Sequence, residues 1–286
     1  MKKKIILVTG AGSQLGKTLR MLKVKGYEFD YQSRYMLDIS NAKTVKTFFK
    51  QKKYDYCFNF AAYTNVTQAE NERVKCFRNN VNGVANLAKA AKKYDFTLVH
   101  ISTDYVFDGL KKSPYTEADA TNPINFYGKT KLLGEEIIQQ YLNKYFIIRT
   151  SWLYSDYNKN FVKTMLQLAR QKAKIKVIEN QIGVPTYAKD LIDFIFTAIK
   201  KAEKDNNLYG LYHFSNKGKA SWYDFGKKVL ELARIENKIA PIKDVEYNDV
   251  ACRPLYSVLS KDKAEKNFDI KIRNWKKALE DYFSYQ

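Results

Sequence analysis

Residues that build metal and disulfide sites are scarce in this sequence. Its 286 residues include three cysteines, Cys57, Cys76 and Cys252, and two histidines, His100 and His213. Cysteines this far apart fit neither a disulfide framework nor the paired spacing of a zinc site. Both histidines lie within strand-like patterns, where we expect structural roles. Histidine-ligated metals and Ser-His-Asp triads are therefore disfavoured, whereas a Mg²⁺ site built from Asp and Glu stays open.

Long apolar runs are absent too. No uninterrupted apolar stretch approaches the ~18 residues that a membrane-spanning helix needs. The chain starts with Met1 and three lysines, and only four apolar residues follow before Thr9. That segment is too short for the apolar region of a secretory signal peptide. We therefore expect a cytoplasmic protein with reduced cysteines and no membrane partner.

Basic residues, by contrast, are abundant, and the formal net charge is +20. A strongly basic chain raises the hypothesis of nucleic-acid binding. The lysines, however, are spread over predicted helix faces such as 89–93 and 200–204, without a long basic tail or a basic run interleaved with aromatic residues. We therefore predict no nucleic-acid partner, and we expect the positive potential to help recruit an anionic ligand.

The N-terminal segment predicts a nucleotide-binding turn. Ile5 to Val8 form a short apolar run typical of a buried strand, and Gly10, Gly12 and Gly16 follow at once. Leucines then recur at helical spacing across 15–22. In this context glycines let the backbone approach a pyrophosphate, and the helix N-terminus offers it free N–H groups. A plain tight turn is the alternative, but strand, turn and helix together favour nucleotide binding.

A second segment, His100 to Lys131, combines the end of a strand with the start of a helix. The apolar run Leu98 to Ile101 predicts a buried strand, with Thr103 at its carboxyl end, where parallel sheets bind ligands. From Gly128 onward the residues suit a helix. Three apolar residues are spaced four apart on one of its faces: Leu133, Ile137 and Tyr141.

Tyr127 and Lys131 are also four residues apart, so their side chains are expected to meet. An ammonium favours phenolate, and we predict that Lys131 lowers the pKa of Tyr127 from its ordinary value of about 10. With the Thr103 hydroxyl beside them, these groups would form a proton-donating site. A chance pair on the surface is the alternative. An activated tyrosine together with a nicotinamide cofactor indicates hydride transfer at a carbonyl.

Strand-like and helical segments alternate along the first half of the chain. Strands are predicted at 27–32, 56–60 and 145–149, and helices at 42–52 and 84–91. This alternation predicts an α/β fold with a Rossmann-type, doubly wound parallel sheet. We assign residues 1–150, with part of 185–215, to a dinucleotide-binding domain. Residues 151–286 mainly form a smaller, discontinuous C-terminal substrate-binding domain that is interleaved with the first.

The glycine turn, together with the Tyr127 and Lys131 pair, resembles the extended branch of the short-chain dehydrogenase/reductase superfamily, which acts on nucleotide sugars. Finer motifs are similar to those of the dTDP-4-dehydrorhamnose reductases and follow that family's order over nearly the whole chain. These motifs lie at 59–64, 102–109, 149–154, 160–162, 181–186 and 253–254. The family usually has glycine where Ser13 stands, with Gly12 displaced by one position, and this departure bears on the geometry of the turn.

The resemblance implies three groups of site residues. Thr103, Tyr127 and Lys131 would be catalytic. Tyr127 and Lys131 would also bind the cofactor, together with Gly10, Ser13, Gln14, Leu15, Gly16, Arg34, Asp38, Ile39, Ala61, Ala62, Tyr63 and Asn80. Substrate contacts are implied for Thr64, Val66, Asp104, Tyr105, Trp152, Gln181 and Arg253.

Some of these residues have alternative interpretations. Asn80 opens a predicted helix and is equally well explained as its cap, and Trp152 suits either a core or a sugar ring. Asp30 lies where an acid that binds the ribose 2′-hydroxyl is expected. The family pattern instead places Ser33 and Arg34 at the strand end. A guanidinium suits a 2′-phosphate, so we favour NADPH over NADH, with a solvated charge as the alternative role of Arg34.

The resemblance therefore implies a homodimer that reduces the C4 ketone of dTDP-4-dehydro-L-rhamnose to dTDP-L-rhamnose with NADPH. A reductase or epimerase for another nucleotide-linked 4-ketosugar, and a non-catalytic NADP-binding regulatory subunit, are the alternatives. A dehydratase is disfavoured, because Asp104 is followed by Tyr105 rather than by the second carboxylate that such relatives use. Some relatives carry Mg²⁺ at a subunit contact.

Overall fold

The computed structural model describes residues 3–171, 174–236, 238–247 and 249–284. Its central element is a six-stranded parallel sheet in the order β10-β5-β4-β3-β1-β2. The strands are β1 (Lys4–Thr9), β2 (Tyr27–Gln32), β3 (Tyr56–Asn59), β4 (Thr97–Thr103), β5 (Tyr145–Thr150) and β10 (Gly210–His213). From β1 the order runs outward both ways, through β2 on one side and β3 on the other. The predicted doubly wound fold is confirmed.

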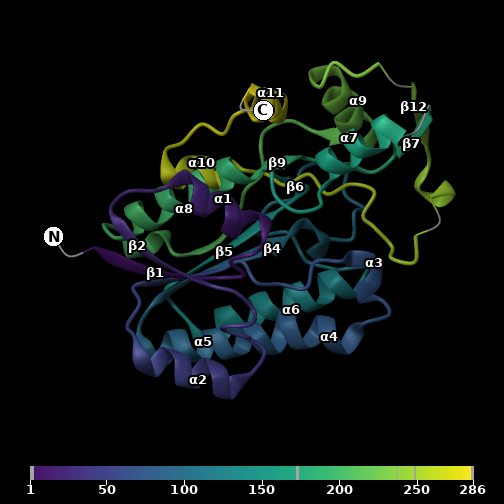
Figure 1. The fold of residues 1–286 in the computed structure, drawn as a ribbon. Coiled ribbons are helices and arrows are strands. Elements are labelled where there is room, and N and C mark those ends of the chain that lie inside the picture. The colour runs from purple at the N-terminus through teal and green to yellow at the C-terminus, as the bar shows by residue number, and fades with distance from the viewer. Residues whose placement is uncertain (1–2, 172–173, 237, 248, 285–286) are drawn as a thin grey trace.

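Helices cover both faces of this sheet (Figure 1). One face packs against α1 (Gln14–Leu22), α8 (Ala188–Ala202) and α10 (Asp262–Phe268), and the other against α2 (Ala42–Gln51), α5 (Gly83–Tyr94) and α6 (Phe126–Tyr141). Successive strand residues point to opposite faces, so Ile6 and Val8 join one hydrophobic cluster and Leu7 the other. Burial on both sides explains why the strands read as continuous apolar runs.

A third hydrophobic cluster lies at the upper right of Figure 1. Its helices are α7 (Phe161–Gln171), α9 (Trp222–Leu232) and α11 (Trp275–Ser284). Short strand pairs accompany them: β7 (Lys174–Ile178) with β12 (Lys238–Ile242), β6 (Leu153–Tyr154) with β9 (Thr186–Tyr187), and β8 (Ile182–Gly183) with β11 (Ala220–Ser221). The segment that forms α8 and β10 returns to the main sheet. The predicted division into two interleaved domains stays a prediction.

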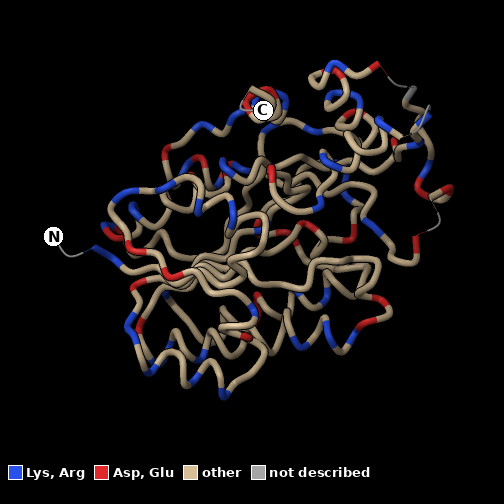
Figure 2. The backbone as a smooth tube through the Cα atoms, in the orientation of Figure 1, with Lys and Arg blue, Asp and Glu red and all other residues tan. Residues whose placement is uncertain are grey.

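Short helical segments connect these layers. They are α3 (Val66–Ala69), α4 (Arg73–Phe77), the π-helix Arg78–Asn82, and single 3₁₀ turns at Asp104–Val106, Asn206–Leu208 and Asp244–Glu246. Lys and Arg residues lie mostly along outer helices and loops, with Asp and Glu residues among them (Figure 2). Within the described ranges, no helix is both long and apolar enough to span a bilayer.

Helix α6 packs on the sheet through polar as well as apolar residues. Leu133 is 39% exposed, whereas Glu135 and Ile138 are buried. The Glu135 carboxylate forms an ion pair with Arg149 of β5, at 2.7 Å, and also accepts a hydrogen bond from the Ser102 hydroxyl. Of the three apolar residues spaced four apart, Ile137 and Tyr141 pack against a hydrophobic cluster. Polar partners on the sheet hold this helix in place, and the apolar periodicity does not reveal them.

We predict that Glu135→Ala destabilises the fold by roughly 3–5 kcal/mol, because it leaves the Arg149 guanidinium buried without a counter-charge. Urea denaturation followed by circular dichroism measures the loss. The control is Glu28→Ala, which removes an exposed ion pair with Lys52 and should cost at most about 1 kcal/mol. Equal losses for both variants would show that the buried pair does not hold α6 in place.

Candidate active site

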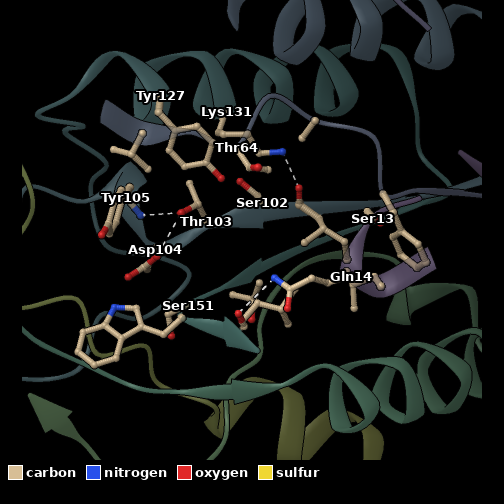
Figure 3. Close-up of a pocket in the computed structure, with 18 of the residues that line it drawn as sticks. Ser13, Gln14, Thr64, Ser102, Thr103, Asp104, Tyr105, Tyr127, Lys131 and Ser151 are labelled. Atoms are coloured by element: carbon tan, nitrogen blue, oxygen red, sulfur yellow. Dashed lines mark hydrogen bonds between the residues drawn. The ribbon is translucent and has the colours of Figure 1, made fainter. Parts of the chain in front are cut away.

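The carboxyl ends of β1, β3, β4 and β5 border one cavity of about 540 Å³ (Figure 3). Open parallel sheets bind ligands at this edge, where the strand order reverses. Ser13 and Gln14 line it from the glycine turn, and Thr103, Tyr127 and Lys131 line it from the second segment. The fold therefore brings together the two parts of the chain in which the sequence predicts nucleotide binding and proton donation.

The glycine turn fits close to the sheet and opens helix α1 toward the cavity. Gly10 has φ +63°, and a Cβ there would lie 2.5 Å from the backbone nitrogen of Ala61. A Cβ on Gly16 would lie 2.7 Å from the Gly10 carbonyl oxygen, whereas one on Gly12 would meet nothing within 4 Å. Ser13 caps α1, its hydroxyl accepting from Gly16 N at 3.1 Å. Serine at this position thus supplies a helix cap.

The positive end of the α1 dipole therefore faces the cavity, next to the backbone of the glycine turn. This cradle fits the pyrophosphate of a dinucleotide. A segment that the sequence did not single out closes over it. The Asn158 side chain donates to the Gly12 carbonyl at 2.8 Å, and the Ser155 hydroxyl donates to the side chain of Gln14 at 3.0 Å.

Thr103 and Tyr127 approach each other from different elements. Thr103 ends β4, and its hydroxyl accepts from Tyr105 N and donates to Asp104, both at 3.1 Å. Tyr127 stands in the first turn of α6, and the Thr103 side chain is close enough to lower its pKa. Asn125 caps that turn by accepting from Gly128 N at 2.8 Å. A Cβ on Gly128 would collide with the Tyr105 carbonyl, so this glycine lets the helix start against the strand end.

Lys131 reaches β4, where its partners in the described structure lie. Its Nζ donates to the Ile101 carbonyl at 2.6 Å and lies 3.1 Å from His100 Nε2. The other ring nitrogen of His100 lies 3.0 Å from the Asn59 amide, which accepts from the Thr9 hydroxyl at 2.7 Å. A buried polar chain thus crosses β4, β3 and β1 behind the lysine. His100 has the structural role expected from its position in a strand.

These surroundings contradict the predicted effect of the lysine. Burial raises the pKa of Tyr127 above its ordinary value, and Asp104 raises it further, while the Thr103 hydrogen bond opposes the shift. Burial also lowers the pKa of Lys131 to about 8. The prediction that Lys131 lowers the pKa of Tyr127 is therefore wrong. A phenol with a raised pKa stays protonated at neutral pH and is suited to donate a proton.

Comparison with known proteins places this arrangement in a family. Residues 3–285 match a family model described as the RmlD substrate binding domain. The chain is 38% identical to the dTDP-4-dehydrorhamnose reductase of Escherichia coli K12, over 98% of both chains. It is 40% identical to the spore coat polysaccharide biosynthesis protein SpsK of Bacillus subtilis, over 97% of this chain and 96% of SpsK. The chain belongs to the dTDP-4-dehydrorhamnose reductase family.

Solved structures agree with this membership. The dTDP-4-dehydrorhamnose reductase of Bacillus anthracis, crystallised with NADP, superposes with a TM-score of 0.94 at 37% identity, covering both chains completely. A UDP-galactose 4-epimerase at 19% identity, with a TM-score of 0.80, covers 98% of this chain and 97% of its own. Identity that low shows the shared fold alone.

The substrate residues implied by the reductase family fall into two sets. Five of them line the cavity: Thr64, Val66, Asp104, Tyr105 and Trp152. Gln181 is buried and Arg253 binds Asp249 and Thr67, and neither is among the residues that line this cavity.

Trp152 has a partner that the sequence did not identify. Its indole stacks on Trp222, with ring centroids 3.5 Å apart, and both line the cavity. Trp152 has φ +46°, and a Cβ on Gly183 would lie 2.6 Å from its ring. Asn158 and Lys159 were also missed as cavity residues. In the sequence, Asn158 and Lys159 lie next to a family motif, and Trp222 begins a predicted helix. Those positions were the available signals for these three residues.

The cofactor residues implied by the family also divide. Among the implied cofactor residues outside the glycine turn and helix α6, Ala62 lines the cavity. Asn80 is buried behind it: its side chain accepts from Tyr63 N at 2.8 Å and donates to Tyr63 O at 3.1 Å. It also donates to Thr130 at 3.0 Å. Asn80 therefore anchors the loop that follows β3, and its direct contact with a cofactor stays a prediction.

Arg34 lies away from the cavity, in a separate surface hollow that it shares with Arg78. Both guanidinium groups face the Asp38 carboxylate, at 3.9 Å and 3.7 Å. In the part of the chain that the structure describes, no group of three or more His, Cys, Asp or Glu is placed to hold a metal ion. The Mg²⁺ prediction gains no support from these residues.

We predict that Gly10→Ala lowers the free energy of unfolding by about 1–3 kcal/mol, because a side chain here is strained at positive φ and collides with Ala61. Gly12→Ala is the matched control, since its methyl group enters open space. Thermal denaturation should leave the melting temperature of Gly12→Ala close to that of the wild type. A Gly10→Ala protein as stable as this control would contradict the described turn.

Proposed function

We propose that this protein uses NADPH to reduce the C4 ketone of dTDP-4-dehydro-L-rhamnose to dTDP-L-rhamnose. The observation that carries the proposal is the cavity in which the N-terminus of α1 meets Thr103, Tyr127 and Lys131. The relatives from E. coli and B. anthracis carry the name of this enzyme, and the second was crystallised with NADP. When bound, NADPH supplies the hydride.

The residues of the chain supply the proton and hold the reacting groups. Tyr127 stays protonated at neutral pH and is placed to protonate the ketone oxygen as it becomes a hydroxyl. The Thr103 hydroxyl, which lies beside Tyr127, would help hold that oxygen. An ammonium has three N–H donors, and Lys131 directs one to the Ile101 carbonyl. Since Lys131 also lines the cavity, another of its donors would hold the nicotinamide ribose.

Arg34, which follows β2, and Arg78, which begins the π-helix, support NADPH as the cofactor. Arg34 and Arg78 flank Asp38 from two segments and form a compact basic site. A guanidinium binds phosphate through a fork of two N–H groups, which suits the 2′-phosphate that distinguishes NADPH from NADH. Asp38 and Ile39 would border the adenine, as the family resemblance implies.

Further cavity residues would hold the sugar. Thr64 approaches from the loop after β3, Val66 from the start of α3, and Tyr105 from the 3₁₀ turn after β4. The stacked indoles of Trp152 and Trp222 add a flat apolar surface, of the kind that suits a deoxysugar ring. A homodimeric state and a cytoplasmic location belong to the same proposal and rest on the family resemblance.

A cofactor-oxidation assay tests the function. The purified protein is mixed with NADPH and, in turn, with dTDP-, GDP- and CDP-linked 4-ketosugars, and loss of NADPH absorbance is followed. We expect dTDP-4-dehydro-L-rhamnose to be reduced fastest, with one NADPH consumed for each sugar alcohol formed. Sugar conversion without net loss of NADPH would instead indicate an epimerase. Cofactor binding without turnover on any sugar would indicate a regulatory subunit.

We predict that Tyr127→Phe binds NADPH like the wild type but turns over roughly 10²–10⁴-fold more slowly, because it lacks the proton donor. Fluorescence titration measures binding, and the oxidation assay measures turnover. Tyr141→Phe is the control, since Tyr141 lies on the same helix but outside the cavity. Near-normal turnover by Tyr127→Phe would remove Tyr127 from the mechanism.

A further inference from the structure

Asp104 places a buried carboxyl group beside the proton-donating residues. Its side chain is 2% exposed. One carboxyl oxygen accepts from the Thr103 hydroxyl at 3.1 Å, and the other has no hydrogen-bond partner among the described residues. Thr103 in turn interacts with Tyr127 and lowers the pKa of its phenol. Figure 3 shows the Thr103 hydroxyl between the phenol and the carboxyl group, so the three side chains form one short chain of exchangeable protons.

Each reduction leaves Tyr127 without its proton, which must be replaced before the next cycle. The polar chain behind Lys131 is poorly placed to supply one. It leads through His100 and Asn59 to Thr9, and each of these side chains is at most 1% exposed. Burial, followed by the charge of Lys131, holds the pKa of His100 well below its ordinary value. This branch therefore passes through a neutral imidazole and ends at Thr9, inside the sheet.

We propose that Asp104 holds the proton that restores Tyr127 after each reduction, and that the proton passes through the Thr103 hydroxyl. The proposal rests on the proposed reductase function. The Asp104 O–H bond breaks as its proton moves to Thr103 Oγ1, while the original Thr103 proton moves to the phenolate and forms the Tyr127 O–H bond. This step transfers protons only and involves no oxidation or reduction. Asp104 then takes one proton from water after the product leaves, so each ketone reduced consumes one solvent proton.

The surroundings of Asp104 favour a carboxyl group that carries a proton near neutral pH. Burial raises its pKa to about 7, and the nearby hydroxyls of Ser257 and Thr103 only partly oppose that shift. Tyr127 faces it from α6, and Tyr105 follows it in the chain. The nearby cation Arg253 interacts with Tyr105 and is bonded to Asp249 and Thr67. Asp104 does not need to touch the ketone; it is a positioning residue that acts through Thr103.

Asp104→Asn provides the decisive variant, because an amide keeps the shape and can donate to Thr103 but cannot pass on a proton. Enzyme loaded with NADPH is mixed rapidly with the ketosugar, and the first turnover is compared with steady-state turnover. We expect a first-turnover rate within about twofold of the wild type, a steady-state kcat lower by roughly 10- to 100-fold, and an unchanged KM for the sugar. Asp108→Asn, in the same segment but outside the cavity, should change none of these values.

Three outcomes would overturn the proposal. A raised KM with normal kcat would show that Asp104 binds the sugar instead. First and later turnovers that slow together would show a structural role. Unchanged kinetics would show that another group supplies the proton. Failure of the wild type to oxidise NADPH with any ketosugar would count against the reductase function itself, which separates that failure from these outcomes.

A measurement without substrate or cofactor tests the protonation of Asp104 directly. A carboxyl group whose pKa is raised by folding stabilises the folded state at low pH, and this contribution is lost as the pH rises through the folded pKa of about 7. The melting temperature of Asp104→Asn relative to the wild type should therefore rise between about pH 5 and about pH 8. A difference that stays constant over this range would show that Asp104 does not hold a proton near neutrality.

Discussion

The buried polar junction between helix α6 and the sheet decides the geometry of the site. The carboxylate of Glu135 receives both the Arg149 guanidinium and the Ser102 hydroxyl, and Lys131 donates to the Ile101 carbonyl one turn earlier. Unpaired buried charges cost several kcal/mol each, so the helix has one favourable position against β4 and β5. Because Tyr127 lies in the first turn of this helix, that position also places the phenol beside the end of β4.

Burial at the same junction sets the protonation of the site. Desolvation lowers the pKa values of Lys131 and His100 and raises those of Tyr127 and Asp104. Each shift favours the neutral form. A site whose phenol and carboxyl group retain their protons near neutral pH can act as a proton donor. Reduction of a ketone requires such a donor. Electrostatic pairing of Tyr127 with Lys131 is a smaller influence than the removal of water.

The cavity is also where two of the hydrophobic clusters of the molecule meet. The segment after β6 bonds to the glycine turn through Asn158 and Ser155. On another wall, Trp222 of α9 stacks on Trp152, which follows β5. Side chains that belong to the packing around α7, α9 and α11 therefore complete a cavity whose floor is the parallel sheet.

Features that depend on short stretches of chain could be determined from the sequence alone. The strand, glycine turn and helix at 4–22 and the placement of Thr103 and Tyr127 near strand and helix ends follow from local patterns of apolar residues and glycine. The polar contacts of α6, the partner of Trp152 and the shifted pKa values could not be determined in this way. They depend on pairs such as Ser102 with Glu135 and Trp152 with Trp222, which are far apart in the sequence. Only folding brings such groups together and excludes the water that would otherwise screen them.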